Sequence, residues 1–278
     1  MKVLILGASG LLGQALMREW KGDEVVGLSV EDVDIRDAAS VRGILEKERP
    51  ACIVLAAAYT DVDGCEGNPE LAFAVNRDGA VHVARAADDI GANLLFLSSD
   101  YVFDGKKDAP YAVDDTRNPQ SVYGRTKAEA EVQLLESTRR CCIVRTAWLF
   151  GTGGKCFPDT ILKAAATRPL LEVVSDQRGC PTYSIDLARA IVQLCRKGAS
   201  GIVHVTNGGN CSWFEFAREI IRQAGLPTEV RPISTGQIAR PAPRPAYSVL
   251  SPASMGQFEI EMPNWQDALQ RYLRERRG

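Results

Sequence analysis

Histidine, paired-cysteine motifs and long apolar runs are scarce or missing in this sequence. Only His82 and His204 occur among 278 residues, each in an apolar setting, which argues against a histidine-rich metal site or a Ser/His/Asp triad. We expect both histidines to be structural, and we identify no metal-ligand cluster. The eight cysteines show no CxxC spacing, and several lie in apolar runs where free thiols pack as small hydrophobic groups. This usage predicts a reducing, cytoplasmic compartment.

A strong net charge is also missing. With 33 Lys and Arg against 35 Asp and Glu, the formal net charge is −2, so composition offers no basic surface and we expect no nucleic-acid partner. No apolar stretch approaches the length of a membrane span, and the start, MKVLILGASG, lacks the apolar segment and cleavage site of a signal peptide. We therefore expect no membrane association. A hydrophobic content of 45% in 278 residues is typical of a globular chain with a sizeable core.

Apolar runs alternate with helical patterns over the first half of the chain. The runs are rich in Val, Ile and Leu, and the segments between them have helical periodicity. Strands that are apolar on both faces and separated by helices indicate a parallel sheet covered on both sides. We therefore predict an α/β fold with a Rossmann-like, doubly wound parallel sheet. The predicted strands lie in KVLILG, EVVGLS, ACIVLAAA, NLLFLSS and CCIVRTAWLF.

The pattern changes beyond about residue 151, where fewer elements follow. GIVHVTN is a late strand that could rejoin the main sheet, and the remaining elements are too few for a large independent fold. The last helix, WQDALQRYLRER, is amphipathic, and its apolar side could pack inside a lobe or against another subunit, so a homodimer stays open. We predict a dinucleotide-binding domain of residues 1–152 plus about 183–206, and a smaller C-terminal substrate-binding lobe of about 153–182 plus 207–278.

Three glycines separate the first predicted strand from the first predicted helix. In GASGLLG, Gly7, Gly10 and Gly13 allow a tight turn, close approach of a pyrophosphate to backbone N–H groups, and close helix packing. The helix N-terminus that follows favours negative charge. On the first βα turn this pattern predicts dinucleotide binding, with a ligand-free glycine turn as the alternative.

The second predicted strand does not reveal which dinucleotide is bound. It ends in Ser29, where an acid would bind the ribose 2′-hydroxyl of NAD and an arginine would accommodate the 2′-phosphate of NADP. Glu31 and Asp32 would oppose a 2′-phosphate, while Arg36 could approach it. The choice between NADH and NADPH therefore stays open.

The stretch SVYGRTKAEAE places Tyr123 and Lys127 four positions apart at the start of a predicted helix, so the two side chains share one face. Taken alone, such a pair is usually surface pairing or packing. After a glycine turn and a strand ending in serine, however, the YxxxK spacing resembles the extended short-chain dehydrogenase/reductase superfamily. Within it the whole chain is similar to the family of dTDP-4-dehydrorhamnose reductases. The matching pieces are GASGLLG, AAAYTDVDGCE, LSSDYVFDG, QSVYGRTKAEAE, VRTAWLFG, SDQRGCPT, RPAPRPAYSVLS and WQDAL.

The resemblance implies a ketone reductase that takes its hydride from NADPH or NADH. Its substrate would be a dTDP-sugar, dTDP-4-dehydro-6-deoxy-L-mannose, reduced at C4 to dTDP-L-rhamnose for cell-surface polysaccharide synthesis. Tyr123 would donate the proton. Lys127 and the oxidised nicotinamide would lower the pKa of Tyr123, which for a free phenol lies near 10, and Lys127 would also bind ribose. Ser99, where the family usually has threonine, would hold the carbonyl oxygen.

Further site residues are implied by the same resemblance, with packing as the alternative role for several of them. Asn76 would support the active-site backbone, and Arg240 and Arg178 are weaker candidates for binding a diphosphate. The expected cofactor-binding residues are Gly7, Ser9, Gly10, Leu11, Leu12, Gly13, Asp34, Ile35, Ala57, Ala58, Tyr59, Tyr123 and Lys127. The expected substrate-binding residues are Thr60, Asp100, Tyr101, Trp148 and Arg244.

Two departures from the family pattern bear on the sugar. Leu55 and Cys156 stand where family members often have asparagine, which leaves sugar specificity less certain than the catalytic pair. Two other functions therefore stay open. One is an epimerase or dehydratase acting on a nucleotide sugar with tightly held NAD; the other is a non-catalytic subunit like the regulatory subunit of methionine adenosyltransferase.

Overall fold

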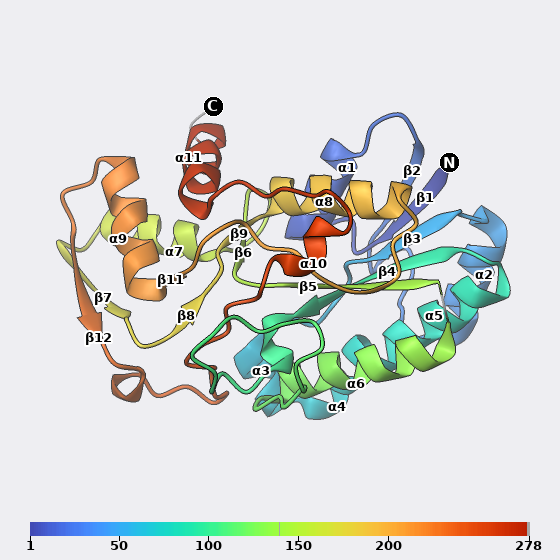
Figure 1. Ribbon diagram of the computed structural model, residues 1–278, viewed down its shortest axis with the longest axis horizontal. Coiled ribbons are helices and arrows are strands. Elements are labelled where there is room, and N and C mark those ends of the chain that lie inside the picture. Colours follow the sequence, from blue (N-terminus) through green and yellow to red (C-terminus); the bar gives the residue numbers. More distant parts are fainter. Residues whose placement is uncertain (139, 277–278) are drawn as a thin grey trace.

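The computed structural model describes residues 1–138 and 140–276, with a six-stranded parallel sheet at its centre (Figure 1). The strand order is β10-β5-β4-β3-β1-β2, which confirms the predicted doubly wound α/β fold. Because β2 and β3 lie on opposite sides of β1, the carboxyl ends of β1 and β3 form the switch point where open α/β sheets bind ligands. The strands are β1 (Lys2–Leu6), β2 (Glu24–Leu28), β3 (Cys52–Leu55), β4 (Asn93–Ser99), β5 (Cys141–Thr146) and β10 (Gly201–His204).

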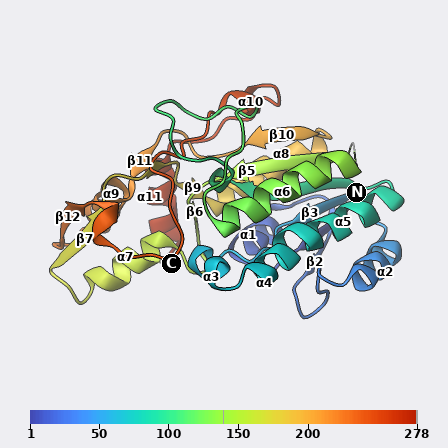
Figure 2. The ribbon, with the colours of Figure 1, turned by 90° about the horizontal axis from the view of Figure 1, so that it is seen from below.

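Alternate residues of the strands enter two separate cores. Val3 and Ile5 of β1 pack under α1 and α8, whereas Leu4 and Leu6 pack under α2, α5 and α6. Since successive side chains of a strand point to opposite faces, a strand covered on both sides must be apolar throughout. Figure 2 shows α5 and α6 side by side along one face. The helices are α1 (Leu11–Glu19), α2 (Ala38–Glu48), α5 (Gly79–Asp89), α6 (Val122–Ser137) and α8 (Ser184–Arg196).

Short elements gather at the carboxyl edge of the sheet, between β3 and α6. Asn68 caps α4 by accepting a hydrogen bond from the backbone N–H of Leu71, and Pro69 occupies the first helical position, where its missing N–H costs nothing. A π-helical turn then leads into α5, and π-turns often mark functional sites. These elements are α3 (Val62–Gly67), α4 (Pro69–Phe73), the π-helix η1 (Ala74–Asp78) and the 3₁₀ helix η2 (Asp100–Val102).

The lobe lies at one end of the molecule and contains three two-stranded sheets within the described residues (Figure 1). The segment SDQRGCPT, predicted as a loop, contains β8 and the first residue of β9, and the pairing of β7 with β12 was not predicted. The strands are β6 (Leu149–Phe150), β7 (Leu170–Val174), β8 (Arg178–Gly179), β9 (Thr182–Tyr183), β11 (Cys211–Ser212) and β12 (Glu229–Ile233). Its helices are α7 (Phe157–Ala165), α9 (Trp213–Ala224), η3 (Thr235–Gln237) and α11 (Trp265–Glu275), whereas α10 (Ala253–Gly256) lies beside β10 of the main sheet.

Elements from late in the chain return to the main sheet. GIVHVTN forms β10, which pairs in parallel with β5, and α8 packs beside α1. The discontinuous division into two parts, with its boundaries, stays a prediction.

The C-terminal helix α11 packs inside the lobe. Leu269, Tyr272 and Leu273, the apolar side seen in the sequence, are all buried within the chain itself. A homodimer would therefore need a surface other than this one.

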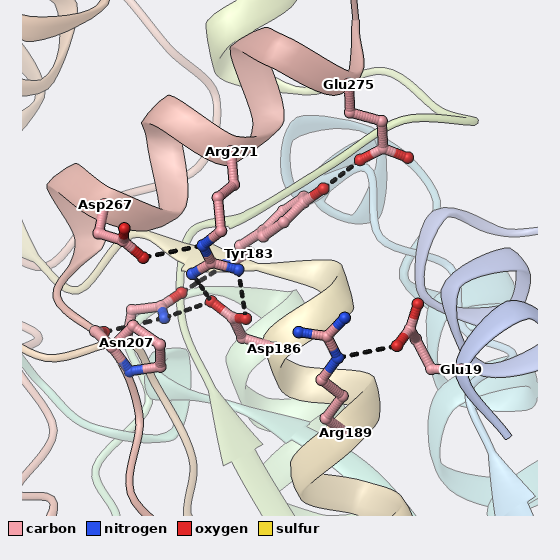
Figure 3. A network of polar contacts seen from close by, with 9 residues as sticks. Glu19, Tyr183, Asp186, Arg189, Asn207, Asp267, Arg271 and Glu275 are labelled. Atoms are coloured by element: carbon pink, nitrogen blue, oxygen red, sulfur yellow. Dashed lines mark hydrogen bonds and ion pairs between the residues drawn. The ribbon is translucent and has the colours of Figure 1, made fainter. Parts of the chain in front are cut away.

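Ion pairs fix α11 to the sheet domain (Figure 3). The Arg271 guanidinium makes two hydrogen bonds of 2.7 Å to the carboxylate of Asp186 on α8. Asp186 also accepts from Asn207, which in turn accepts from the backbone N–H of Tyr183. At the end of α11, Glu275 accepts from the hydroxyl of Tyr183. Because Asp186 is buried, this pairing is a strong constraint on where α11 lies.

Two cysteines lie close together in the core. Cys52 of β3 and Cys195 of α8 are neighbours with Cα atoms 6.9 Å apart, and the other six cysteines are free and buried. The two lie 143 residues apart and meet only because α8 packs on the sheet, so no local spacing could reveal them. Within the described residues no helix is long and apolar enough to cross a membrane.

Candidate active site

A cavity of about 860 Å³ opens at the carboxyl ends of the central strands. Its wall contains all the residues predicted to be catalytic, cofactor-binding or substrate-binding except Arg244, brought together from the glycine turn, the ends of β3, β4 and β5, and the start of α6. The further candidates Asn76, Arg178 and Arg240 are not among the lining residues. The predicted residues on the wall are Gly7, Ser9, Gly10, Leu11, Leu12, Gly13, Asp34, Ile35, Ala57, Ala58, Tyr59, Thr60, Ser99, Asp100, Tyr101, Tyr123, Lys127 and Trp148.

The three glycines of the turn meet different steric demands. Gly7 has φ +92°, and a Cβ there would lie 2.5 Å from the backbone N of Ala57. A Cβ on Gly13 would lie 2.1 Å from the carbonyl oxygen of Gly7, so α1 can rest on the turn only without a side chain there. Gly10 is different, because a Cβ there would meet nothing of the chain closer than 3.4 Å. The folded chain itself does not demand glycine at this position.

The first turn of α1 is free to bind an anion. Gly10 is its N-cap and offers no side chain to the first helical N–H groups. Gly10 and Leu11 line the cavity, so these donors and the positive end of the helix dipole meet at its wall. Such a helix terminus fits a pyrophosphate.

The far end of the cavity carries a paired arginine. Ser29 donates from its N–H and its hydroxyl to Asp32, each at 2.8 Å. Arg36 forms an ion pair of 2.5 Å with Asp34, and this pairing holds the pKa of the Asp34 carboxyl below its usual value. Because Asp34 largely neutralises the charge of Arg36, the geometry here favours neither the 2′-hydroxyl of NAD nor the 2′-phosphate of NADP.

Tyr123 stands on the first turn of α6, which packs directly on the end of β4. Ser121 caps the helix by accepting from the N–H of Gly124, and a Cβ on Gly124 would lie 2.2 Å from the carbonyl oxygen of Tyr101. This close approach places the Tyr123 and Tyr101 rings edge to face, with centroids 5.7 Å apart. Burial raises the pKa of Tyr123, and a hydrogen bond with Ser99 partly opposes that rise.

Lys127 lies deeper on the same helix. Its ammonium group donates to the carbonyl oxygen of Leu97 at 2.9 Å and lies 4.7 Å from the centroid of the Phe96 ring. Burial lowers the Lys127 pKa to about 8, and the charge of Glu131 opposes this shift. For Tyr123, burial is the largest cause of its raised pKa. The expected lowering of that pKa by Lys127 together with the oxidised nicotinamide stays a prediction.

Ser99 and Asp100 form a buried polar pair beside Tyr123. The Ser99 hydroxyl donates to Asp100 Oδ1 at 2.9 Å and accepts from the N–H of Tyr101. The other oxygen of Asp100 is buried without a hydrogen-bond partner among the described residues. Burial raises the Asp100 pKa to about 6. A buried, unpaired acceptor on a cavity wall is suited to a ligand hydroxyl.

Asn76, in the π-helical turn, ties two walls of the cavity together. Its side chain accepts from the N–H of Tyr59 at 2.8 Å and donates to the carbonyl oxygen of Tyr59 at 3.0 Å. It also donates to the hydroxyl of Thr126, which donates to the carbonyl oxygen of Tyr123. Asn76 therefore supports the backbone at the site, as the resemblance implied.

Comparison with known proteins agrees with this geometry. The family described as "RmlD substrate binding domain" matches residues 1–277. The chain belongs to this family. A spore coat polysaccharide biosynthesis protein, SpsK, of Bacillus subtilis is 42% identical and covers 99% of this chain and 98% of its own length. A dTDP-4-dehydrorhamnose reductase of Streptomyces griseus is 41% identical, over 96% of this chain and 91% of its own. The crystal structure of a dTDP-4-dehydrorhamnose reductase from Bacillus anthracis in complex with NADP has a TM-score of 0.96 at 35% identity, covering 99% of both chains.

The arginine candidates lie off the cavity wall. Arg244 makes hydrogen bonds of 2.7 and 2.9 Å to the two carboxylate oxygens of Asp63 on α3. Arg178 pairs with Glu215, and neither Arg178 nor Arg240 is on the described wall. A diphosphate role for Arg244 would require it to leave Asp63, and that role stays a prediction.

The two departures from the family pattern lie away from the cavity. Leu55 is buried in the sheet core, and Cys156 contacts the Tyr272 hydroxyl beneath α11. Neither is among the described lining residues, so the structure does not show either residue at the position of a bound sugar.

Sequence reasoning missed several residues of the wall, among them Lys155 and Trp213. Lys155 follows a loop that docks on the glycine turn, because Gln14 donates to the carbonyl oxygens of both Ser9 and Gly153 at 2.8 Å. Trp213 begins α9, more than sixty residues beyond the other tryptophan of the wall, Trp148. From the sequence, only the start of a helix could be recognised at Trp213. Its closeness to Trp148 depends on how the lobe folds.

Proposed function

We propose that this protein reduces the C4 ketone of dTDP-4-dehydro-6-deoxy-L-mannose to give dTDP-L-rhamnose, with NADPH or NADH as the hydride donor. The observation that carries the proposal is the arrangement of one cavity. A phosphate-binding helix end with glycine turn lies at one part of its wall, and Tyr123, Lys127 and Ser99 lie together at another. A ketone reductase needs these two parts together.

Each catalytic side chain has a role that follows from its state. When bound, the nicotinamide cofactor supplies the hydride that C4 receives. Tyr123 gives its proton to the carbonyl oxygen, so the ketone becomes an alcohol, and its raised pKa keeps the phenol protonated at neutral pH. Ser99 would turn its hydroxyl from Asp100 toward that oxygen and stabilise the developing negative charge. Lys127 holds a buried positive charge that binds ribose and favours the phenolate left after proton transfer.

The proposed substrate class rests on the family's dTDP-sugar reductases and on the cavity's mixed wall. Trp148 offers an apolar face to a deoxysugar, and the unpaired oxygen of Asp100 can accept from a sugar hydroxyl. An epimerase or dehydratase would recycle its cofactor within each turnover, whereas a reductase consumes it, so cofactor consumption distinguishes the two. A regulatory subunit would not need Tyr123, Lys127 and Ser99 in one cavity, so their presence argues against that alternative.

The test is oxidation of NADPH and NADH by the purified protein, each supplied separately. The 4-keto sugar nucleotide is generated in place from dTDP-glucose by an upstream dehydratase and epimerase. Stoichiometric, substrate-dependent oxidation with dTDP-L-rhamnose as product supports the proposal. Tyr123→Phe should bind the cofactor but lose turnover, and near wild-type turnover by this variant would refute the mechanism.

A further inference from the structure

A buried carboxylate lies behind the cavity wall, one helical turn after Lys127. Glu131 of α6 is fully buried and is not among the described lining residues. Its two oxygens accept hydrogen bonds of 2.9 and 2.6 Å from the guanidinium of Arg145 on β5, which is also fully buried. Arg117, which is partly exposed, donates to the same carboxylate at 3.2 Å. Cationic partners of this kind stabilise the ionised form of a buried carboxylate.

Lys127 and Glu131 bond to consecutive residues of β4. The Lys127 ammonium group donates to the carbonyl oxygen of Leu97 at 2.9 Å, and the Glu131 carboxylate accepts from the hydroxyl of Ser98. Side chains four positions apart on a helix share one face, and these two contacts bring both ends to the same short stretch of strand. The negative charge of Glu131 therefore lies near the positive charge of Lys127 in a buried setting, where charges interact more strongly than at the surface.

The other titratable neighbours of Lys127 add no negative charge near pH 8. Burial raises the pKa of the Cys65 thiol on α3 to about 11, so this thiol is neutral there. Burial also raises the pKa of the Tyr123 phenol, on the preceding turn of α6. Arg145 is cationic, and its charge is matched by Glu131 itself. Glu131 is therefore the neighbour whose charge supports the ammonium group.

We propose that Glu131 is a positioning residue for the reduction: its buried carboxylate keeps the Lys127 ammonium group charged and fixed against the end of β4, where it would meet the cofactor ribose. This inference rests on the proposed function, which assigns Lys127 that role. Burial lowers the Lys127 pKa to about 8, and the attraction of Glu131 acts in the opposite direction. Removing this attraction should lower the Lys127 pKa further, by about one to two units for charges one helical turn apart at an effective dielectric constant of about 20.

The test compares Glu131→Gln with the matched control Glu129→Gln. Each variant removes one carboxylate from α6, but Glu129 is 47% exposed and pairs with Arg77. Carbon-13 NMR of the lysine side chains, assigned with Lys127→Met, follows the protonation of Lys127 in the ligand-free protein. Calorimetry from about pH 6 to about pH 10 measures the Kd for NADPH, which depends on the same proton but needs no sugar.

We expect the titration midpoint of Lys127 to lie near pH 8 in the wild type and in Glu129→Gln, with NADPH affinity falling as the pH rises through it. In Glu131→Gln both should move down by about one to two pH units, so the Kd for NADPH at pH 8 rises about fivefold or more. At pH 6 the Kd should stay within about twofold of the wild-type value. A merely structural defect would instead weaken NADPH binding at every pH.

An unchanged Lys127 midpoint in Glu131→Gln, an equal shift in Glu129→Gln, or a shift that NADPH affinity does not follow refutes the role of Glu131. If Glu131→Gln does not fold, Arg117→Met decides the matter. It removes a cation from the same carboxylate and should raise the Lys127 midpoint by about half a unit, so an unchanged or lower midpoint refutes the role. A wild type that does not bind NADPH refutes the proposed function, whatever its lysine titration.

Discussion

Replacing Gly10 by alanine should separate cofactor binding from folding. The backbone of Gly10, with φ −73° and ψ 169°, is open to any residue, and an added Cβ would meet only the carbonyl oxygen of Gly7, at 3.4 Å. The fold therefore tolerates the methyl group, and as an N-cap change it should alter the free energy of unfolding by less than about 1 kcal/mol. The same methyl group would project where a pyrophosphate must approach the N–H groups of α1.

The expected loss of affinity follows from the contact that is blocked. A hydrogen bond to a charged group contributes about 1.5–3 kcal/mol, so losing one phosphate contact should raise the Kd for NADPH by a factor of about 10 to 150. Gly13→Ala should behave differently, because its Cβ would lie 2.1 Å from the carbonyl oxygen of Gly7 and 2.6 Å from Ala8 Cα. Relieving those backbone overlaps requires α1 to move, at a cost of about 1–3 kcal/mol or more in stability.

The assay pairs calorimetric titration with NADPH and thermal unfolding of each variant. Gly43→Ala is the matched control: it lies in the middle of α2 with no atom within 4 Å of an added Cβ, so it should raise stability by about 0.5–1 kcal/mol and leave NADPH binding unchanged. Wild-type affinity in Gly10→Ala would show that the ligand does not need this glycine. If Gly10→Ala is destabilised as much as Gly13→Ala, the interpretation that only Gly13 is required by packing of the turn is wrong.

Three further predictions concern charge. Because the Lys127 pKa is lowered to about 8, kcat/KM for the cofactor should fall as pH rises through about 8 and the ammonium is lost; a flat profile to pH 10 would contradict this. The pKa of Asp100 is raised from 3.8 to about 6, so protonation of this group stabilises the folded protein at low pH, and this stabilisation is lost as the pH rises through about 6. Asp100→Asn should therefore be more stable than wild type at pH 8, by on the order of 3 kcal/mol, and not at pH 4, as denaturant titrations at the two pH values would reveal. Arg145→Met leaves the fully buried Glu131 without its closest cation and should lower the free energy of unfolding by about 3–5 kcal/mol. Arg117 pairs with the same carboxylate but is partly exposed, so Arg117→Met should lower it by less than about 1 kcal/mol. Equal losses of stability in the two variants would contradict the argument from burial.

The sequence predicted the elements whose signals are local. A strand covered on both sides is apolar throughout, so β1, β3, β4 and β5 were visible as runs, and the glycine turn was visible because steric demand falls on single positions. The Tyr123 and Lys127 pair was also local, since helical spacing alone brings the two side chains to one face. These features predicted the glycine-turn part of the cavity wall and the Tyr123 and Lys127 pair, whereas the other predicted wall residues came from the family resemblance.

Features that depend on long-range packing were not predictable. β12 contains Pro232, pairs only with β7, and reads as irregular chain until its partner is known. The contacts of Trp213 with Trp148, and of Arg244 with Asp63, join segments that the lobe brings together. Burial is likewise a property of the whole fold, so its contribution to the Tyr123 pKa could not be predicted from the sequence.

The raised Tyr123 pKa bears on the state of the proposed proton donor. In the proposed reduction the tyrosine must be protonated when the substrate arrives, and burial, which raises its pKa, favours that state. A cation that favours the phenolate also lowers the pKa of the phenol, so the charge proposed for Lys127, held against the carbonyl oxygen of Leu97, acts against burial. The proposed mechanism therefore depends on a balance: burial keeps the proton on the phenol, and the neighbouring cation makes its transfer easier.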